Sequence, residues 1–339
     1  PDQGEGLVAA PEHLRVRDLT VGFKTFERFE QVLDIGELHI DRGEAYGLVG
    51  ESGAGKTVLA LAILGLLRQP PARVQAGELS LEGESLLSMS AKELRDIRGR
   101  RISMIFQDPM SALDPAFSVG KQLTEVIRQR QGLDKKQADG RALELMQLVE
   151  LPDPEMMLGK YPHQLSGGQR QRIIIALALA CGAQLLIADE PTRNLDVTVQ
   201  ASMLKTIYKL RQELGVSLLF VANNLSLVSA MCDRVGILLK GRIVETGRVR
   251  DVVRTPLHPY TLDLLHAVPR REERLGDEDQ KVFEEVDRSL SRCGHYARCE
   301  LRGPACQGQE ALQLTYVTPT HGVACPHAVA ASREVVGCG

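Results

Sequence analysis

The sequence predicts an α/β fold. Its clearest sign is a short apolar strand, Tyr46 to Val49, that runs into a glycine-rich loop and then into a segment of helical character. A second apolar strand begins at Leu185 and ends in two adjacent carboxylates, Asp189 and Glu190. Elsewhere short apolar strands alternate with segments of helical periodicity, which is typical of α/β proteins.

The glycine-rich loop satisfies the phosphate-loop pattern G-x-x-x-x-G-K-[ST]. Its glycines let backbone N–H groups turn toward a β-phosphate, and the helix that follows points its positive end at the anion. Lys56 adds a positive charge, and Thr57 offers a hydroxyl to Mg²⁺. The sequence therefore predicts a site for a nucleoside triphosphate and Mg²⁺, with the nucleotide-binding residues Gly50, Ser52, Gly53, Gly55, Lys56 and Thr57.

The N-terminal part predicts a leader followed by two strands. Residues 1–12 show no periodicity, whereas Leu14 to Phe23 and Val32 to Ile40 alternate apolar and polar residues as half-buried strands do. Phe23 is a candidate to stack on adenine, because aromatic faces attract bases. A phenylalanine that fills the core at a strand end explains the same pattern.

The middle of the chain predicts further strands and helices in alternation, followed by a mostly helical zone from about 108 to 180. Gln107 directly follows a predicted strand. The expected elements are a helix over Val58 to Leu67, a strand pair over Gln75 to Leu87, a helix over Ala91 to Arg98, a strand over Ile102 to Phe106, and helices over Val119 to Ile127 and Ala142 to Val149.

Two further motifs carry chemistry. Ser166, Gly167, Gly168 and Gln169 open a helix that runs to Ala180, which predicts a second anion site at a helix N-terminus. The apolar strand that begins sixteen residues after Gln169 presents Asp189 to hold Mg²⁺ and Glu190 to orient or deprotonate an attacking water. A solvated strand end would also account for such a carboxylate pair.

Length, charge and composition limit the classes of protein to which this chain can belong. The 339 residues suit two or three units, and the net charge of −3 gives no general reason to bind nucleic acid. The longest apolar run, Ile173 to Ala188, is too short and too interrupted to span a bilayer, and no signal segment opens the chain. We therefore expect a cytoplasmic protein.

Taken in order, these motifs resemble the ATP-binding cassette (ABC) family over residues 14–254. The resemblance implies a P-loop NTPase (RecA-like) nucleotide-binding domain over about 13–254, with an inserted α-helical subdomain at about 108–180. It also implies two cassettes packed head to tail, with Ser166 to Gln169 acting in trans on the partner's nucleotide. Gln107 would sense Mg²⁺ and water, and Asp196 would link the two sites.

Longer stretches, among them Tyr161 to Gln169 and His258 to Thr261, resemble the oligopeptide, dipeptide and nickel importer branch. That branch has a cysteine-bearing C-terminal extension, which implies a small extension over 255–339. Five of the seven cysteines lie in the last 47 residues. Spacing alone leaves the role of four of them open between a metal site and buried thiols. The resemblance favours a 4Fe–4S cluster, with Zn²⁺ as the alternative, on Cys293, Cys299, Cys306 and Cys325.

Two departures from the family bear on hydrolysis. Asn223 stands where the family has a histidine that holds the γ-phosphate and the attacking water, and Arg193 and Asn194 stand where small residues are usual. An amide can donate a hydrogen bond but cannot take up a proton near neutral pH. This pattern predicts a slow site on this chain within a heterodimeric cassette pair, while normal hydrolysis with a tolerated Asn223 is the simpler alternative.

The resulting functional expectation is an ATPase subunit at the cytoplasmic face of the inner membrane. It would couple hydrolysis to uptake of a peptide-like solute through two separate permease subunits, served by a solute-binding protein, with a different chain as the second cassette and no nucleic acid partner. The alternative is a soluble cassette ATPase that acts on nucleic acid or ribosomes, against which stand the single cassette and the absence of sustained heptads. A third possibility is a subunit that barely hydrolyses ATP and mainly completes its partner's site.

Overall fold

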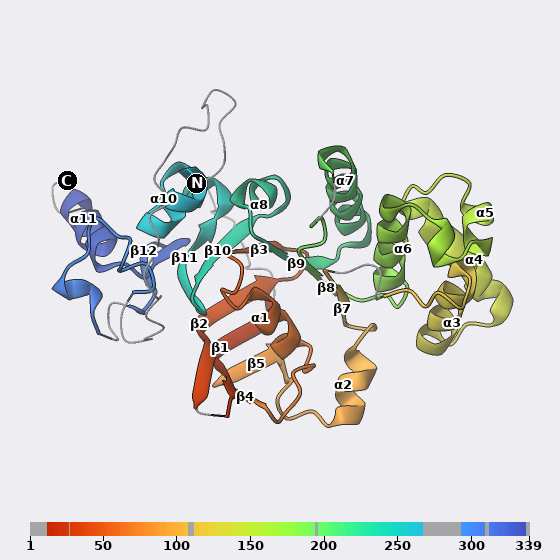
Figure 1. Ribbon diagram of the computed structural model, residues 1–339, viewed down its shortest axis with the longest axis horizontal. Helices are drawn as coiled ribbons and strands as arrows, with labels where there is room; N and C mark the ends of the chain where they lie inside the picture. The colour runs from red at the N-terminus through yellow and green to blue at the C-terminus, as the bar shows by residue number, and fades with distance from the viewer. Residues whose placement is uncertain are drawn as a thin grey trace, which may run out of the picture.

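The computed structural model describes residues 12–26, 28–107, 112–193, 196–266, 293–308 and 312–336. Residues 1–11 of the expected leader, Asn194 and the charged run from 270 to 287 lie outside these ranges. Within them the chain forms two β-sheets with helices around them, and the larger sheet runs through the middle of the molecule (Figure 1).

The larger sheet has eight strands among the described residues. Its central strands are parallel and its C-terminal strands antiparallel. All residues of two neighbouring parallel strands, Ala45–Val49 and Ser217–Ala222, are buried, as expected where helices or a second sheet cover both faces. In spatial order the strands are β12 (Thr315–Thr318), β13 (His321–Val323), β11 (Arg242–Arg248), β10 (Arg234–Leu239), β3 (Ala45–Val49), β9 (Ser217–Ala222), β8 (Leu185–Asp189) and β7 (Ile102–Ile105).

The smaller sheet is antiparallel and packs on one side of the larger one. Its strands are β1 (Glu12–Lys24), β2 (Phe29–Asp41), β4 (Ala72–Gln75), β5 (Glu78–Leu81) and β6 (Glu84–Ser85). The helix after the glycine-rich loop, α1 (Lys56–Ile63), joins the core between the sheets, where Leu33, Leu59 and Leu219 belong to one buried cluster. This core fixes the glycine-rich loop between the two sheets.

The other helices lie along the outside of the sheets. Three of them, α3, α4 and α5, gather with α6 at one end of the molecule (Figure 1). In α3 the buried residues Val119, Leu123 and Ile127 repeat every four residues and form the apolar face expected of a surface helix. The helices are α2 (Ala91–Ile97), α3 (Val119–Gln131), α4 (Lys135–Leu148), α5 (Pro154–Gly159), α6 (Gly167–Leu179), α7 (Val197–Leu214), α8 (Leu225–Met231), α9 (Val249–Arg254), α10 (Pro259–His266) and α11 (Pro326–Val336).

The C-terminal extension is joined to the larger sheet. Strand β13 pairs antiparallel with β11, with Glu245 opposite Val323, and the N–H of Ala324 donates to the carbonyl of Val244 at 2.8 Å. The residues that we assigned to an extension therefore continue the sheet of the cassette. Among the residues described, no helix has the length and apolar character needed to cross a bilayer.

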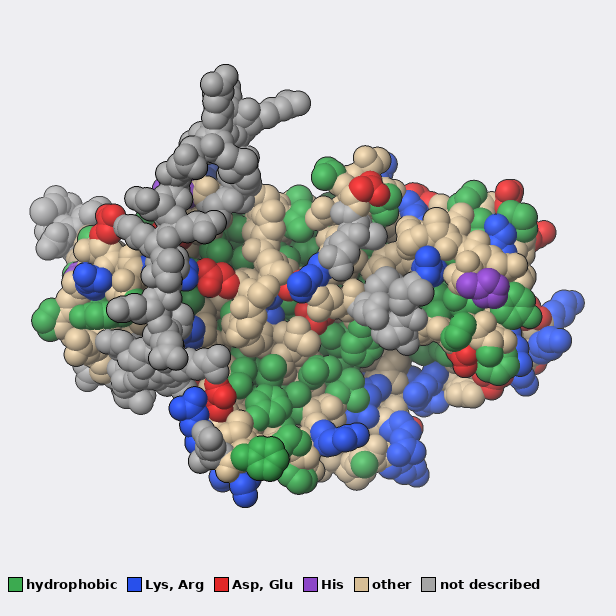
Figure 2. Space-filling view, in the orientation of Figure 1, with side chains coloured by type: hydrophobic (Ala, Val, Ile, Leu, Met, Phe, Trp, Pro, Cys, Tyr) green, Lys and Arg blue, Asp and Glu red, His purple; other side chains and the backbone are tan. Residues whose placement is uncertain are grey.

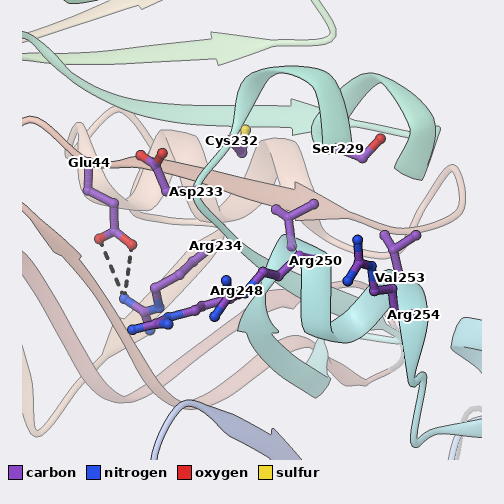
Figure 3. A pocket seen from close by; sticks show the side chains of 10 residues that line it. Glu44, Ser229, Cys232, Asp233, Arg234, Arg248, Arg250, Val253 and Arg254 are labelled. Carbon is purple, nitrogen blue, oxygen red and sulfur yellow. Dashed lines mark hydrogen bonds and ion pairs between the residues drawn. The ribbon is translucent and has the colours of Figure 1, made fainter.

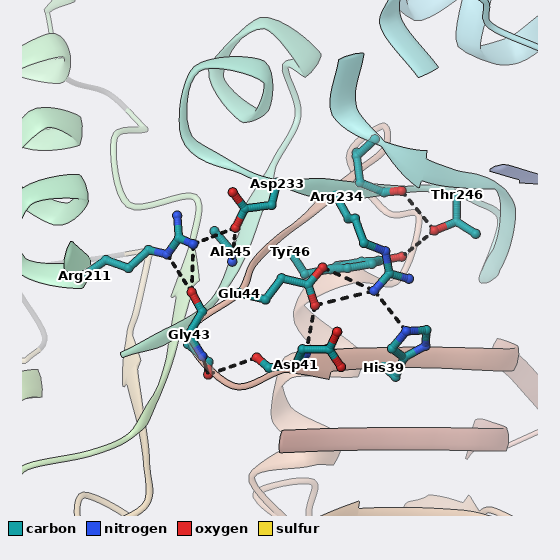
Figure 4. Close-up of polar contacts among 12 residues, drawn as sticks. His39, Asp41, Gly43, Glu44, Ala45, Tyr46, Arg211, Asp233, Arg234 and Thr246 are labelled. Carbon is teal, nitrogen blue, oxygen red and sulfur yellow. Dashed lines mark hydrogen bonds and ion pairs between the residues drawn. The ribbon is translucent and has the colours of Figure 1, made fainter. Parts of the chain in front are cut away.

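A polar network ties the elements together at the edge of the sheet where β3 and β10 begin (Figure 4). The carboxylate of Asp233 accepts from Arg211 at 2.6 Å and from the N–H of Ala45 at 2.9 Å. Next to it Arg234 donates to Glu44 at 3.2 Å. The network links α7, β3 and β10.

A cavity of about 580 Å³ opens beside this network and is rich in arginine (Figure 3). Arg248, Arg250 and Arg254 contribute to its wall from α9 and the residue before it. It lies where β3 begins, whereas the glycine-rich loop follows the other end of that strand. The cavity is therefore separate from the predicted nucleotide site.

Candidate functional site

The glycine-rich loop connects β3 to α1 and has the backbone that the pattern predicts. A Cβ atom at Gly50 would lie 2.2 Å from the carbonyl oxygen of Leu238, so no larger residue fits there without movement. Gly53 and Gly55 have φ angles of +82° and +106°, which favour glycine. Gly55 is the N-cap of α1, so the loop leads directly into the positive end of that helix.

Lys56 places its ammonium group inside this loop. Its side chain is buried, and Nζ donates to the carbonyls of Gly50 at 2.8 Å and Glu51 at 2.9 Å and to Oδ1 of Asn223 at 2.6 Å. Glu190 Oε1 lies 3.7 Å from the same nitrogen. Burial lowers the pKa of Lys56, while the nearby carboxylates of Glu190 and Asp189 act in the opposite direction. The site therefore holds a cation in a partly desolvated position.

Thr57 and Asp189 meet beside this lysine. The Thr57 hydroxyl donates to Oδ2 of Asp189 at 2.8 Å. Asp189 is buried at the end of β8, and burial raises the pKa of its carboxyl group. Its second oxygen, Oδ1, is buried and accepts no hydrogen bond from any described residue. A buried carboxylate oxygen with spare capacity beside a hydroxyl is the hard oxygen donor set that Mg²⁺ prefers, so these residues fit the predicted ion.

Glu190 follows Asp189 and is surrounded by the residues that depart from the family pattern. Its backbone has a φ angle of +44°, in the left-handed region that residues other than glycine rarely adopt. Arg193 Nη1 lies 3.1 Å from Glu190 Oε2. The amide of Gln107 is best oriented with its oxygen toward Arg193, where it accepts from Nε at 3.1 Å. The sequence marked Arg193 as unusual, but its contact with Glu190 emerges only from the structure.

The Ser-Gly-Gly segment lies apart from this loop. Ser166 is the N-cap of α6, with Oγ accepting from the N–H of Gln169 at 3.3 Å and Gln169 Oε1 accepting from the N–H of Ser166 at 3.0 Å. Figure 1 shows α6 well separated from α1. Asp196 is likewise a helix cap, accepting from the N–H of Val199 at 2.9 Å at the start of α7. The structure thus brings Lys56, Asp189 and their neighbours together but leaves the Ser-Gly-Gly segment elsewhere.

The aromatic residues near the end of β1 differ in exposure. Phe23 is half-buried and packs against the core between the sheets. Phe26, three residues later, is fully exposed. Figure 2 shows further hydrophobic side chains exposed over α1 and the smaller sheet. Exposed hydrophobic residues in this part of the chain include Phe29 on β2 and Leu66, which follows α1. Phe23 therefore stays a prediction, and Phe26 is a second aromatic side chain nearby that is open to solvent.

Comparison with known proteins gives the family. The chain is 44% identical over 266 residues to the oligopeptide transport ATP-binding protein OppD of Bacillus subtilis, a match that covers 78% of this chain and 74% of that protein. It is 41% identical over 316 residues to the probable peptide ABC transporter ATP-binding protein y4tR of Sinorhizobium fredii, covering 92% and 94% of the two chains. The chain belongs to the ATP-binding proteins of ABC transporters. Its enzymatic activity is ATP hydrolysis coupled to transport.

Family models and solved structures agree with the assignment of this ABC ATPase to the ATP-binding proteins of ABC transporters. The "ABC transporter" model matches residues 33–193, and the model "Oligopeptide/dipeptide transporter, C-terminal region" matches residues 244–306. The ADP- and phosphate-bound dimer of the ATP-binding cassette MJ0796 superposes with a TM-score of 0.62 at 26% identity, covering 70% of this chain and 99% of that one. The predicted cassette fold is confirmed, and the alternative of an ATPase that acts on nucleic acid or ribosomes has no support.

The predicted 4Fe–4S cluster is wrong, and Zn²⁺ in its place has no support. Cys293, Cys299, Cys306 and Cys325 do line one small pocket. In the described part of the ABC ATPase, however, no group of three or more histidine, cysteine or acidic side chains is arranged to hold a metal ion. Burial raises the pKa of the Cys293 and Cys325 thiols, which favours the neutral thiol over the thiolate that binds metals. The cysteines are thiols packed inside the extension, with Cys306 and Cys325 buried.

Proposed function

We propose that this chain is an ATPase subunit of a peptide importer, placed at the cytoplasmic face of the inner membrane. Its cassette would dock on two membrane-spanning permease subunits that a solute-binding protein supplies. The observation that carries the proposal is the meeting of Lys56, Thr57 and Asp189 in one site, in which Lys56 and Asp189 are buried, because it provides the groups that bind and orient MgATP. The peptide substrate is supported by the transport proteins that the chain is similar to.

Within this site we propose a role for each predicted residue. The bound Mg²⁺ would neutralise phosphate charge, held by Thr57, Asp189 and Gln107. Glu190 would orient the attacking water, and Phe23 or the exposed Phe26 would contact adenine. The phosphates would lie on the backbone and side chains of Gly50, Ser52, Gly53, Gly55, Lys56 and Thr57.

A second cassette would complete the site. Ser166, Gly167, Gly168 and Gln169 lie apart from the chain's own loop, which supports a role on a partner's nucleotide. Asp196, at the start of α7 and close in sequence to Arg193, would connect the two sites. We further propose the unit boundaries of the sequence analysis, with about 108–180, which contains α3, α4, α5 and α6, as the helical subdomain and residues 255–339 as the extension.

The partner cassette is proposed to be a different chain, because this chain's own site has features of a slow one. The amide oxygen of Asn223 faces Lys56 at 2.6 Å, and an amide cannot accept a proton from water near neutral pH. Arg193 Nη1 forms an ion pair with Oε2 of Glu190, so one oxygen of the carboxylate that would orient the water is already engaged. Both contacts act on the site built on this chain's own phosphate loop.

Copurification tests the transporter assignment. Affinity-purified chain, expressed with its neighbouring genes and extracted in mild detergent, is expected to bring down membrane-spanning proteins and a second cassette in stoichiometric amounts. Mass spectrometry identifies the copurifying chains and shows whether the second cassette is a different one. Copurification of ribosomes or nucleic acid in place of membrane proteins would contradict the proposal.

A substitution at Glu190 tests the slow site. In the assembled transporter, Glu190→Gln is expected to lower ATP turnover by less than about twofold, while the corresponding change in the partner cassette lowers it at least about 100-fold, since one site carries the hydrolysis. Phosphate release under saturating MgATP measures both. Loss of turnover in Glu190→Gln alone would show that this chain's site hydrolyses ATP normally.

A further inference from the structure

One residue of the phosphate loop is held from two sides. The carbonyl of Glu51 accepts a hydrogen bond from Lys56 Nζ at 2.9 Å, on the side of the predicted nucleotide. Its N–H donates to the hydroxyl of Tyr260 at 3.1 Å, 209 residues further along the chain. Its side chain meets Arg298 of the extension at 3.5 Å. The start of the loop thus lies between Lys56 and the C-terminal part of the chain.

Tyr260 is itself tightly fixed. It is 2% exposed in α10, and its N–H donates to Nδ1 of His258 at 3.1 Å. Burial lowers the pKa of His258 to about 4, so its ring is neutral near pH 7 and Nδ1 is free to accept this bond. The ring of His295, from the cysteine-bearing part of the extension, packs at 5.8 Å from the Tyr260 ring. The hydroxyl is therefore presented to Glu51 by a rigid support.

The support continues into the larger sheet. Glu245 on β11 accepts from the backbone N–H groups of Leu257 and His258, both at 2.9 Å, and from the Thr261 hydroxyl at 2.6 Å. These three bonds set the start of α10 relative to the strands. Because β11 is adjacent to β10 and β10 to β3, the same sheet holds both the loop and the helix that contacts it.

We infer that α10 and the C-terminal extension hold the phosphate loop in its binding conformation, with Tyr260 as the positioning residue. This inference rests on the proposed nucleotide site and adds a part of the chain to it that has none of the nucleotide-binding motifs. Tyr260 contacts the backbone of the loop from outside the phosphate cradle, so it acts on the nucleotide through Glu51. Arg298 contributes less, because its ion pair with Glu51 is exposed on both sides and screened by solvent.

The test compares two tyrosines of the C-terminal region. Tyr260→Phe keeps the ring but removes the hydroxyl, which leaves the Glu51 N–H without its partner. Binding of MgADP to the full chain, measured by titration calorimetry, is expected to weaken roughly two- to tenfold. Hydrogen exchange at the Glu51 amide should become faster. Tyr316→Phe is the matched control, because Tyr316 lies half-exposed on β12 with its ring over Gly322, and it should leave both quantities unchanged.

Each outcome bears on the inference. MgADP affinity in Tyr260→Phe equal to that of the unsubstituted chain would overturn it, and so would equal weakening in Tyr316→Phe, which would indicate general loosening of the extension. Lys56→Ala in the same assay separates this inference from the proposed site. If Lys56→Ala loses affinity and Tyr260→Phe does not, only the role of Tyr260 fails; if Lys56→Ala also binds normally, the nucleotide site itself is wrong.

Discussion

Replacing Lys56 with alanine is expected to lower MgATP affinity or turnover by on the order of tenfold or more. The side chain is almost fully buried, so its charge acts on phosphate in a poorly screened environment. The substitution would also leave Glu190 without the cation that lies 3.7 Å from it. Nucleotide binding to the full chain and phosphate release by the assembled transporter measure the two effects.

The matched control for this change is Lys92→Ala. Lys92 lies exposed in α2, away from the loop, and its replacement should leave affinity and turnover unchanged. Circular dichroism checks that both variants fold. Normal binding and turnover in Lys56→Ala would remove the basis for the nucleotide site.

Replacing Glu245 with alanine is expected to lower the free energy of unfolding by roughly 3–5 kcal/mol, because several hydrogen-bond donors lose the acceptor that they share. Glu245 is 0% exposed. Besides its three bonds to the start of α10, Oε1 lies 2.7 Å from Nε2 of His321 on β13. Alanine would leave four donors without this acceptor, three of them buried. Urea unfolding followed by circular dichroism measures the change.

Two further variants define what Glu245 does. Glu245→Gln keeps one oxygen acceptor but removes the charge, so its loss of stability should be smaller than that of alanine. Glu125→Ala serves as the control, because Glu125 lies exposed on α3 and its replacement should change stability by less than about 0.5 kcal/mol. Equal stability of Glu245→Ala and Glu125→Ala would contradict the role of the buried network.

Local patterns predicted the centre of this protein well. The strand before Gly50, the helix after it and the strand that ends at Asp189 all lie where apolar periodicity and the loop motif placed them. Such motifs are contiguous in sequence, and the chemistry of phosphate binding restricts which residues they contain. The juxtaposition of Lys56 and Asp189 followed, because parallel strands bring their carboxyl ends to one edge of the sheet.

Contacts between distant segments could not be predicted in this way. The pairing of Arg193 with Glu190 depends on side-chain orientation in a loop, and the bond from Glu51 to Tyr260 spans 209 residues. Neither contact produces a periodic pattern in the sequence. The four cysteines of the extension show the opposite error, because their clustering in sequence suggested a metal site where the structure has packed thiols. Cysteine spacing does not distinguish these cases, since cysteine also serves as a small buried hydrophobe.

The pairing of β13 with β11 has a consequence for the solubility of shortened forms of the protein. A strand at the edge of a sheet exposes a row of unpaired N–H and C=O groups, which can pair with another molecule and cause aggregation. Here the hairpin of β12 and β13 covers part of that row on β11, at Glu245 and Thr246, and β12 presents only four residues at the new edge. A cassette cut at residue 254 would retain its nucleotide motifs but expose the flank of β11. We therefore expect a form without the extension to associate with itself more readily than the full chain.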